Sequence, residues 1–166
     1  MSRERTPVYT GGCQCGAVRY ALYSALSDAS VCHCRMCQKA FGSYFAPLGD
    51  VPLDDFVLTR GGVSVFRSSA AVERGFCSRC GTPLSFRYVD EDKIAIALGS
   101  LDRPGEVPPG RQFGLEGRLP FMPAFDLPGA TTETSSTKTH LEQIASANYQ
   151  HPDHDTASWP PEGARR

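Results

Sequence analysis

Seven cysteines constrain this 166-residue chain more than any other feature of its sequence. They lie in three short clusters, which are Cys13 and Cys15, then Cys32, Cys34 and Cys37, and finally Cys77 and Cys80. Their odd number argues against a fully paired disulfide framework, and no export signal is visible, so we expect free thiols in the cytoplasm. Closely spaced thiolates are preferred ligands of zinc, which holds four of them tetrahedrally at about 2.3 Å. The clusters therefore predict metal binding, and they favour zinc over an iron–sulfur cluster.

The first and last clusters together form one candidate structural site. Its four ligands would be Cys13, Cys15, Cys77 and Cys80. Four thiolates complete the coordination shell of zinc, which is typical of a structural site. Gly16 and Gly81 directly follow these pairs, and glycine permits the positive φ with which a chain can leave a tight turn. Such a site would join the start of the domain to its middle, and metal binding would offset the cost of closing that loop.

The middle cluster supplies only three ligands, Cys32, Cys34 and Cys37. Three protein ligands and one exchangeable position are typical of a catalytic zinc. A soft site of this kind accepts an exogenous thiol and deprotonates it, and the thiolate is the form that attacks carbonyl carbon. The residues thus indicate a thiol substrate and a small electrophile. One alternative stays open, in which His33, another side chain or a partner fills the fourth position and both sites are structural.

Four segments resemble the glutathione-dependent formaldehyde-activating (GFA) family. These are GCQCGAV at 12–18, CHCRMCQK at 32–39, FCSRCGTPL at 76–84 and LGSLD at 98–102. The resemblance implies a mainly β, zinc-containing β-tent of short antiparallel strands with one or two short helices. It also implies two zinc ions per chain: a structural ion on Cys13, Cys15, Cys77 and Cys80, and a catalytic ion on Cys32, Cys34 and Cys37.

The activity that the resemblance implies is the condensation of glutathione with formaldehyde to S-(hydroxymethyl)glutathione, classed as a carbon–sulfur lyase reaction. The sequence departs from the family at Gln112 and Phe121, where many members have a histidine and a tryptophan. Glutamine cannot act as a general base near pH 7, so the physiological substrate stays open. Two alternatives also remain, a non-catalytic zinc-binding module, such as a glutathione carrier or protein-interaction domain, and a redox-sensing zinc site.

A short helix is expected to start at or just after Cys34 and to stop near Gly42. Arg35 and Lys39 are four residues apart and would share one face of it. They can bind the carboxylates of glutathione, or they can simply form a solvated cationic face.

The remaining sequence predicts one small β domain with a tail. The 17 Lys and Arg residues balance the 18 Asp and Glu residues, which argues against a nucleic-acid binder. The longest aliphatic run, residues 94–98, is too short to span a membrane. We expect a GFA-like zinc-binding domain at 10–128. A Thr/Ser-rich linker, a helix near 139–149 and a polar, Pro-rich tail are expected within 129–166.

Period-2 patterns and turn residues predict a series of short strands. We expect them at 17–22, 44–48, 56–59, 63–66, 72–76, 84–88 and 93–98. The Gly-Gly pair at 61–62 predicts a hairpin between the third and fourth of these strands. In the tail, His151 and His154 are expected to be solvated, and Trp159 is a candidate anchor on an apolar groove.

Overall fold

The computed structural model describes residues 5–122, 139, 142 and 150–159, and within them it is mainly β, as predicted. The strands are β1 (Tyr9–Gly12), β2 (Arg19–Leu22), β3 (Ser27–Cys32), β4 (Ala46–Pro52), β5 (Phe56–Arg60), β6 (Ser64–Arg67), β7 (Val72–Phe76), β8 (Pro83–Tyr88), β9 (Lys93–Ala97) and β10 (Arg111–Phe113). One α-helix, α1 (Arg35–Phe41), is assigned within residues 5–122 and 150–159, and Thr139 and Glu142 are also helical. The short 3₁₀ turns are η1 (Leu53–Asp55), η2 (Leu98–Ser100), η3 (Pro104–Glu106) and η4 (Leu115–Gly117).

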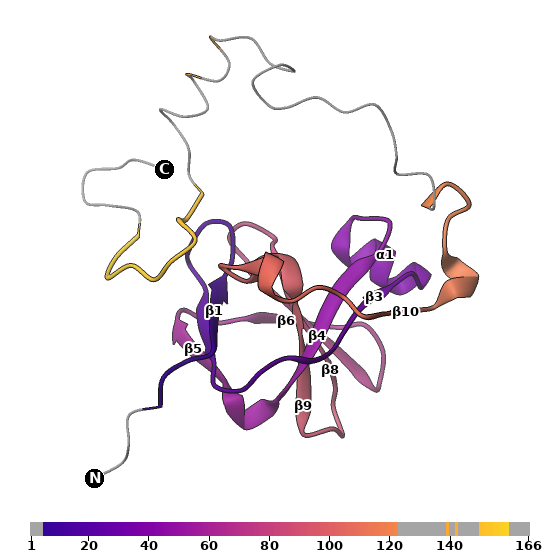
Figure 1. Cartoon of the computed structure of the whole chain (residues 1–166), viewed down its shortest axis with the longest axis horizontal. Coiled ribbons are helices and arrows are strands. Elements are labelled where there is room, and N and C mark those ends of the chain that lie inside the picture. Colours follow the sequence, from indigo (N-terminus) through magenta and orange to yellow (C-terminus); the bar gives the residue numbers. More distant parts are fainter. Residues whose placement is uncertain (1–4, 123–138, 140–141, 143–149, 160–166) are drawn as a thin grey trace.

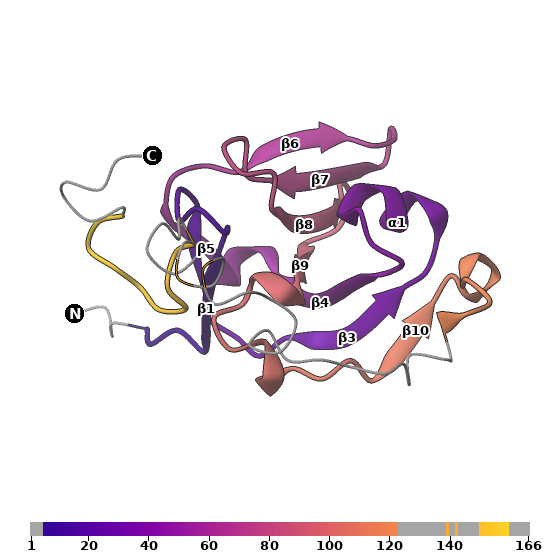
Figure 2. The same cartoon turned by 90° about the horizontal axis from the view of Figure 1, so that it is seen from above.

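The strands form two sheets (Figure 1). The smaller sheet has the order β1-β2-β5, and the larger has the order β10-β3-β4-β9-β8-β7-β6. All neighbouring strands are antiparallel except β10, which runs parallel to β3. Figure 2 shows the larger sheet curling from β6 round to β10, with α1 inside the curve. The three cysteine clusters lie beside the ends of strands from both sheets.

Two apolar clusters form the core. The larger one joins the two sheets through side chains such as Tyr20, Leu22 and Ile96, all fully buried. The smaller one packs Cys37 of α1 against Ala46, Leu48 and Ala95 of the larger sheet. Because Cys37 is itself a core residue, the packing of α1 fixes the position of the three-cysteine segment.

The prediction of a hairpin between strands 56–59 and 63–66 is wrong. β5 pairs with β2 in the smaller sheet, and β6 pairs with β7 in the larger one, so the chain crosses between sheets at Gly61 and Gly62. Gly61 has a φ of +65°, and a Cβ on it would lie 2.0 Å from the carbonyl oxygen of Ala17. The glycine pair thus permits two backbones to cross closely. The same pair of residues is also typical of a hairpin turn, which is why the sequence suggested one.

We expected a half-buried strand at 17–22. In the structure, β2 begins only at Arg19, and all four residues of β2 are buried. As the central strand of the smaller sheet, β2 has no solvent face. The expected helix near Cys34 is confirmed. Cys34 is the N-cap of α1, and Gly42 ends the helix in the left-handed region with a φ of +58°.

Most of the expected linker and helix at 129–149 lies outside the described residues. In the ranges that are described, we find no helix with the length and apolar character needed to cross a membrane. The tail segment 150–159 lies against the smaller sheet, since the guanidinium of Arg60 on β5 donates to the carbonyl and hydroxyl oxygens of Thr156. This contact brings the carboxyl-terminal part of the chain next to the first cysteine pair.

Candidate metal sites

The structure brings two turns together into a cluster of four sulfurs, Cys13, Cys15, Cys77 and Cys80. The first turn joins β1 to β2 and the second joins β7 to β8, so the cluster connects the two sheets. The four Sγ atoms lie within 4.8 Å of one another, with 3.6 Å between Cys13 and Cys15 and 3.9 Å between Cys15 and Cys77. Zinc–sulfur bonds of about 2.3 Å place neighbouring sulfurs of a tetrahedron about 3.8 Å apart. The residues present therefore fit a tetrahedral zinc ion.

Backbone geometry explains how these two turns present their thiols. Gly16 and Gly81 both have positive φ, +70° and +78°, as the sequence predicts. The amide of Val18 donates to Cys13 Sγ at 3.2 Å, which supports a thiolate at that position. Thr82 joins the two turns, because its hydroxyl accepts from the Gln14 amide and lies 3.1 Å from Cys80 Sγ.

Without metal, the thiols of Cys13, Cys77 and Cys80 differ in their pKa values. Burial raises the pKa of Cys13 to about 12 and also raises the pKa of Cys77. Burial opposes ionisation of Cys80 as well, but hydrogen bonds from Thr82 and nearby amides outweigh it and lower its pKa to about 6. A metal ion must displace the protons of the buried thiols, so its binding releases protons.

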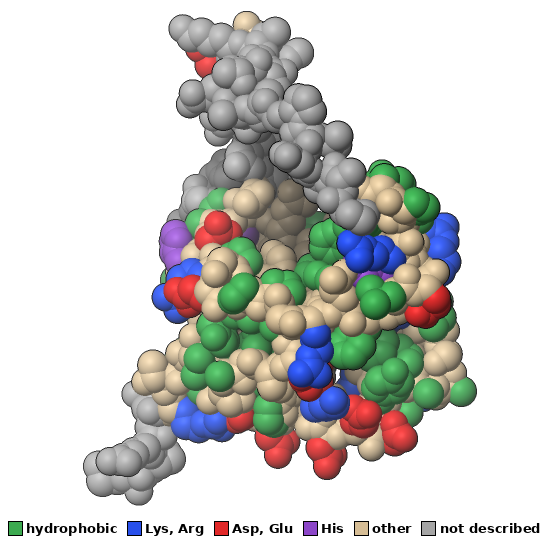
Figure 3. Space-filling view, turned by 45° about the vertical axis from the view of Figure 1, so that its right-hand side comes forward, with side chains coloured by type: hydrophobic (Ala, Val, Ile, Leu, Met, Phe, Trp, Pro, Cys, Tyr) green, Lys and Arg blue, Asp and Glu red, His purple; other side chains and the backbone are tan. Residues whose placement is uncertain are grey.

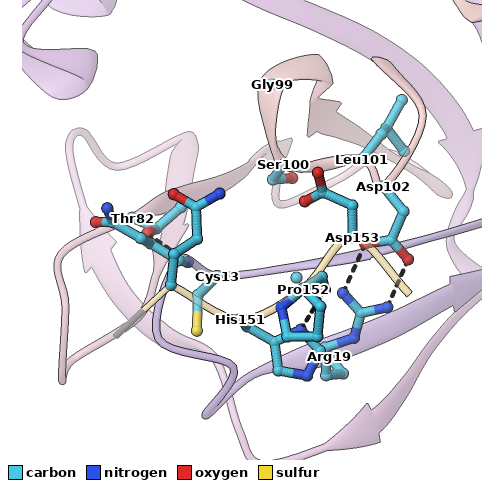
Figure 4. Close-up of a pocket in the computed structure, with 13 residues that line it drawn as sticks. Cys13, Arg19, Thr82, Gly99, Ser100, Leu101, Asp102, His151, Pro152 and Asp153 are labelled. Carbon is cyan, nitrogen blue, oxygen red and sulfur yellow. Dashed lines mark hydrogen bonds and ion pairs between the residues drawn. The ribbon is translucent and has the colours of Figure 1, made fainter. Parts of the chain in front are cut away.

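A small polar cavity of about 210 Å³ lies beside the four-cysteine cluster (Figure 4). Buried Arg19 lines it and donates two hydrogen bonds to the carboxylate of Asp102, at 2.8 and 2.6 Å. A second carboxylate, Asp155 of the tail, accepts from the same guanidinium at 2.6 Å. Because two carboxylates already neutralise Arg19, this cavity offers no free cation to an anionic substrate. It is part of the framework around the cluster.

The second cluster holds three sulfurs, Cys32, Cys34 and Cys37, which also lie within 4.8 Å of one another. Cys32 ends β3, Cys34 caps α1, and Cys37 lies in the first turn of α1, where its amide donates to Cys34 Sγ at 3.5 Å. Within the described part of the chain, no histidine, aspartate, glutamate or further cysteine joins this group. The three thiols fit three corners of a zinc tetrahedron, and the described residues supply no ligand of these types for its fourth corner.

Arg74 on β7 is a residue of this site that the sequence analysis did not single out. Both terminal nitrogens of its guanidinium lie 3.7 Å from Cys37 Sγ, and the group is also 5.0 Å from the ring centre of Phe86. Burial raises the pKa of Cys37 to about 12, although the hydrogen bonds from Arg74 act in the opposite direction. The signal that could have identified Arg74 is its place in the strand, two residues after Val72, because alternate residues of a strand point to the same face.

His33 does not complete the three-cysteine group. Its ring is 2% exposed, and its Nε2 lies within hydrogen-bonding distance, 2.9 Å, of the Gln112 amide oxygen. Gln112, which stands where many family members have a histidine, thus fixes the His33 ring. Gln38 of α1 donates to the carbonyl oxygens of His33 and Gly117, which ties the helix to η4.

Arg35 and Lys39 are exposed and line one hollow of about 600 Å³ beside α1, together with Gln38, Tyr44 and Leu119. Arg35 follows Cys34 directly in the chain, so the cationic hollow lies next to the cap of the helix. Phe121, the second departure from the family pattern, packs edge-on against Tyr44 with ring centres 5.1 Å apart.

One of the two tail histidines differs from the prediction that both are solvated. His154 is exposed, but His151 is only 3% exposed, so the prediction that it is solvated is wrong. The ring of His151 covers Gly16 and contacts Trp159, with ring centres 5.3 Å apart. Trp159 therefore packs against His151 and, like it, lies over Gly16 of the first cysteine turn.

The chain is similar to curated proteins and to one solved structure. A protein of Phaeosphaeria nodorum named "Putative glutathione-dependent formaldehyde-activating enzyme" is 35% identical over 48% of this chain and 43% of its own length. An uncharacterized lyase of Schizosaccharomyces pombe is 32% identical over 51% of this chain and 61% of its own length. The chain thus spans less than two thirds of these curated relatives. A crystal structure of a Rhodobacter sphaeroides protein matches with a TM-score of 0.49 and 22% identity, over 62% of this chain and 98% of that chain.

The family profile described as "Glutathione-dependent formaldehyde-activating enzyme" matches residues 8–115. This range contains all seven cysteines and all ten strands of the described structure. The chain therefore belongs to the glutathione-dependent formaldehyde-activating (GFA) family.

Proposed function

We propose that this chain is a zinc-dependent carbon–sulfur lyase that joins a thiol, glutathione, to formaldehyde at the three-cysteine site. The observation that carries the proposal is the unequal division of the sulfurs, four in one cluster and three in the other. Family membership supports glutathione and formaldehyde as the reactants. The four-cysteine cluster is assigned a structural zinc and the three-cysteine cluster a catalytic one.

At its fourth position, a zinc ion would bind a thiol and keep it ionised near neutral pH. In the reaction the sulfur forms a bond with the carbonyl carbon, and the carbonyl oxygen takes up the proton that the thiol released. The uncatalysed addition is easy, so the chain mainly supplies capture and orientation.

The side chains near the site suit these tasks. Arg74 places a buried positive charge at Cys37, which balances part of the negative charge of three thiolates. Arg35 and Lys39 are the candidate partners for the carboxylates of glutathione, because they are exposed cations beside the cap of α1. Gln112 cannot move a proton, and in this proposal it only positions His33.

Metal counting and exchange spectroscopy on the purified chain test the proposal. We expect two zinc ions per molecule, saturable binding of glutathione by calorimetry, and faster exchange between glutathione, formaldehyde and their adduct in two-dimensional exchange NMR. One zinc ion per molecule would contradict the two-site assignment. Two ions with no acceleration would favour a non-catalytic zinc-binding module.

A pair of matched variants separates the two sites. Cys77→Ser removes a ligand of the closed cluster and should destabilise the whole domain, since metal binding and folding are coupled. Cys34→Ser should leave the circular dichroism spectrum and one zinc ion in place but abolish glutathione binding. Equal loss of structure in both variants would contradict the division into a structural and a catalytic site.

A further inference from the structure

A second hollow opens directly onto the three-cysteine cluster, and neither Arg35 nor Lys39 lines it. Its volume is about 350 Å³, and Cys32 and Cys37 form part of its wall. Three aromatic side chains, Phe86, Tyr88 and Phe113, also line it, together with small or aliphatic residues and three charged ones, Asp28, Asp50 and Lys93. We call it the aromatic cavity. On the face shown in Figure 3, which carries α1 and β10, apolar side chains gather at the lower right, and charged side chains border them below.

The aromatic side chains of the cavity come from two strands of the larger sheet, β8 and β10. Phe86 and Tyr88 of β8 contact each other edge-to-face, with ring centres 5.1 Å apart. Phe113 lies on β10, which reaches the cavity because it pairs in parallel with β3 beside Cys32. Tyr88 and Phe113 are 44% and 48% exposed, although large aromatic side chains gain free energy from burial. Their exposed faces are therefore available to an apolar ligand.

The charged side chains at the rim neutralise one another. Lys93 lies 2.8 Å from the carboxylate of Asp50, and Arg111 lies 3.2 Å from that of Asp28. The guanidinium of Arg74, which contacts Cys37 and the ring of Phe86, is not among the residues that line the cavity. The aromatic cavity therefore offers no unpaired cation to the two carboxylates of glutathione, which the cationic hollow beside α1 suits better.

The cavity is also large for formaldehyde. A water molecule occupies about 30 Å³ in the liquid, and formaldehyde has only two heavy atoms. A cavity of about 350 Å³ is within the range of sites that hold whole organic molecules. Formaldehyde alone would leave most of the aromatic surface in contact with water.

From these observations we propose that the aromatic cavity binds an aldehyde that carries an apolar group of phenyl or branched-alkyl size, as the electrophile of the three-cysteine site. The inference rests on the proposed function and specifies its second reactant. The sulfur of the thiol bonds to the aldehyde carbon, the carbonyl π bond breaks, and its oxygen takes the proton that the thiol released. The product is a hemithioacetal, and no oxidant or reductant is needed.

Binding is tested first without chemistry, on the full zinc-loaded chain. The probe is 2-phenylethanol, an unreactive analogue of phenylacetaldehyde, and saturation-transfer NMR measures its dissociation constant. We expect the double variant Tyr88→Ala/Phe113→Ala to bind the probe at least about fivefold more weakly. Tyr88→Phe, which keeps the ring, should bind it as the native chain does. Val65→Ala, a change of an exposed residue on β6 that lines none of these hollows, is the control.

Reactivity is then compared for two aldehydes, phenylacetaldehyde and formaldehyde, each with glutathione in exchange NMR. The ratio of the two accelerations should favour phenylacetaldehyde in the native chain and in Val65→Ala, and it should fall at least about fivefold in Tyr88→Ala/Phe113→Ala. An unchanged ratio overturns the inference. Acceleration with formaldehyde but no binding of 2-phenylethanol overturns the inference and leaves the proposed function intact, whereas acceleration with neither aldehyde overturns both.

Discussion

Two buried arginines organise the surroundings of the two cysteine clusters. Arg19 is held by Asp102 and Asp155 beside the four-cysteine cluster, and Arg74 is held by Cys37 at the three-cysteine cluster. A guanidinium stays charged at any accessible pH, so each of these residues imposes a fixed positive charge on its surroundings. Arg74 therefore offsets negative charge at the three-cysteine cluster, whereas the charge of Arg19 is balanced by Asp102 and Asp155.

Replacing Arg74 tests its role as a positioning residue for Cys37. We expect Arg74→Met to weaken zinc binding at the three-cysteine site about 10- to 100-fold, because a partner of a metal ligand is lost, and to leave the four-cysteine site unchanged. Competition with a chromophoric chelator measures both affinities. Arg67→Met on neighbouring β6, where the arginine is exposed, is the matched control. Equal weakening of both sites by Arg74→Met would indicate a general loss of structure.

The Arg19–Asp102 pair predicts a defined pH dependence of stability. Burial opposes ionisation of Asp102, but the hydrogen bonds from Arg19 and Thr10 outweigh it and lower its pKa. A carboxyl whose pKa is lower in the folded state stabilises the fold above its unfolded pKa of about 3.9, and this contribution is lost as the pH falls further. Asp102→Asn should therefore lower the free energy of unfolding by about 3 kcal/mol at pH 7.

Chemical denaturation of both chains at several pH values measures this difference. It should stay constant between about pH 8 and pH 5 and shrink only below about pH 4, since the group titrates there. Asp54→Asn, at an exposed position, is the control and should change little. A difference that shrank already between pH 8 and pH 6 would show that Asp102 is not the titrating group.

At the scale of elements, local chemistry made some features predictable. The cysteine spacings, the glycines after them and the cap residues of α1 all act within a few residues, and the structure has them where the sequence indicates. The passage of the chain between the two sheets at Gly61 was not predictable, because a Gly-Gly pair is compatible both with a hairpin turn and with a close approach to the backbone of Ala17. Arg74 and the burial of His151 were missed because their partners are distant in the sequence: Cys37 is 37 residues from Arg74, and Arg60 is 91 residues from His151.

The two cysteine turns allow a paired test of backbone strain. Gly16 and Gly81 both have positive φ, which costs an alanine about 1–2 kcal/mol. At Gly16 an added Cβ would also lie 2.2 Å from the His151 ring, but at Gly81 it would meet open space. Gly16→Ala should therefore lower the free energy of unfolding more than Gly81→Ala does, and it alone should increase hydrogen exchange in residues 150–159. Equal effects of the two variants would contradict the tight packing of His151 on the first turn.

At the scale of the whole molecule, the four-cysteine cluster and the tail act on the same junction. The cluster joins the turn between β1 and β2 to the turn between β7 and β8, and so connects the smaller sheet to the larger one. The tail lies over the first of these turns, with the amide of His151 donating to the Gln14 carbonyl at 2.7 Å. A segment from the end of the chain therefore covers a metal site that connects its beginning to its middle.

This arrangement predicts that the tail slows metal loss from the four-cysteine cluster. His151→Ala removes the ring that covers Gly16, contacts Trp159 and hydrogen-bonds Thr156. Zinc release to excess chelator should become several-fold faster from the four-cysteine cluster, because the first turn becomes more accessible, and should stay unchanged at the three-cysteine site. His154→Ala, three residues away and exposed, is the matched control and should release zinc at the native rate. Native release kinetics in His151→Ala would mean that the cluster retains its metal through the two turns alone, without help from the tail.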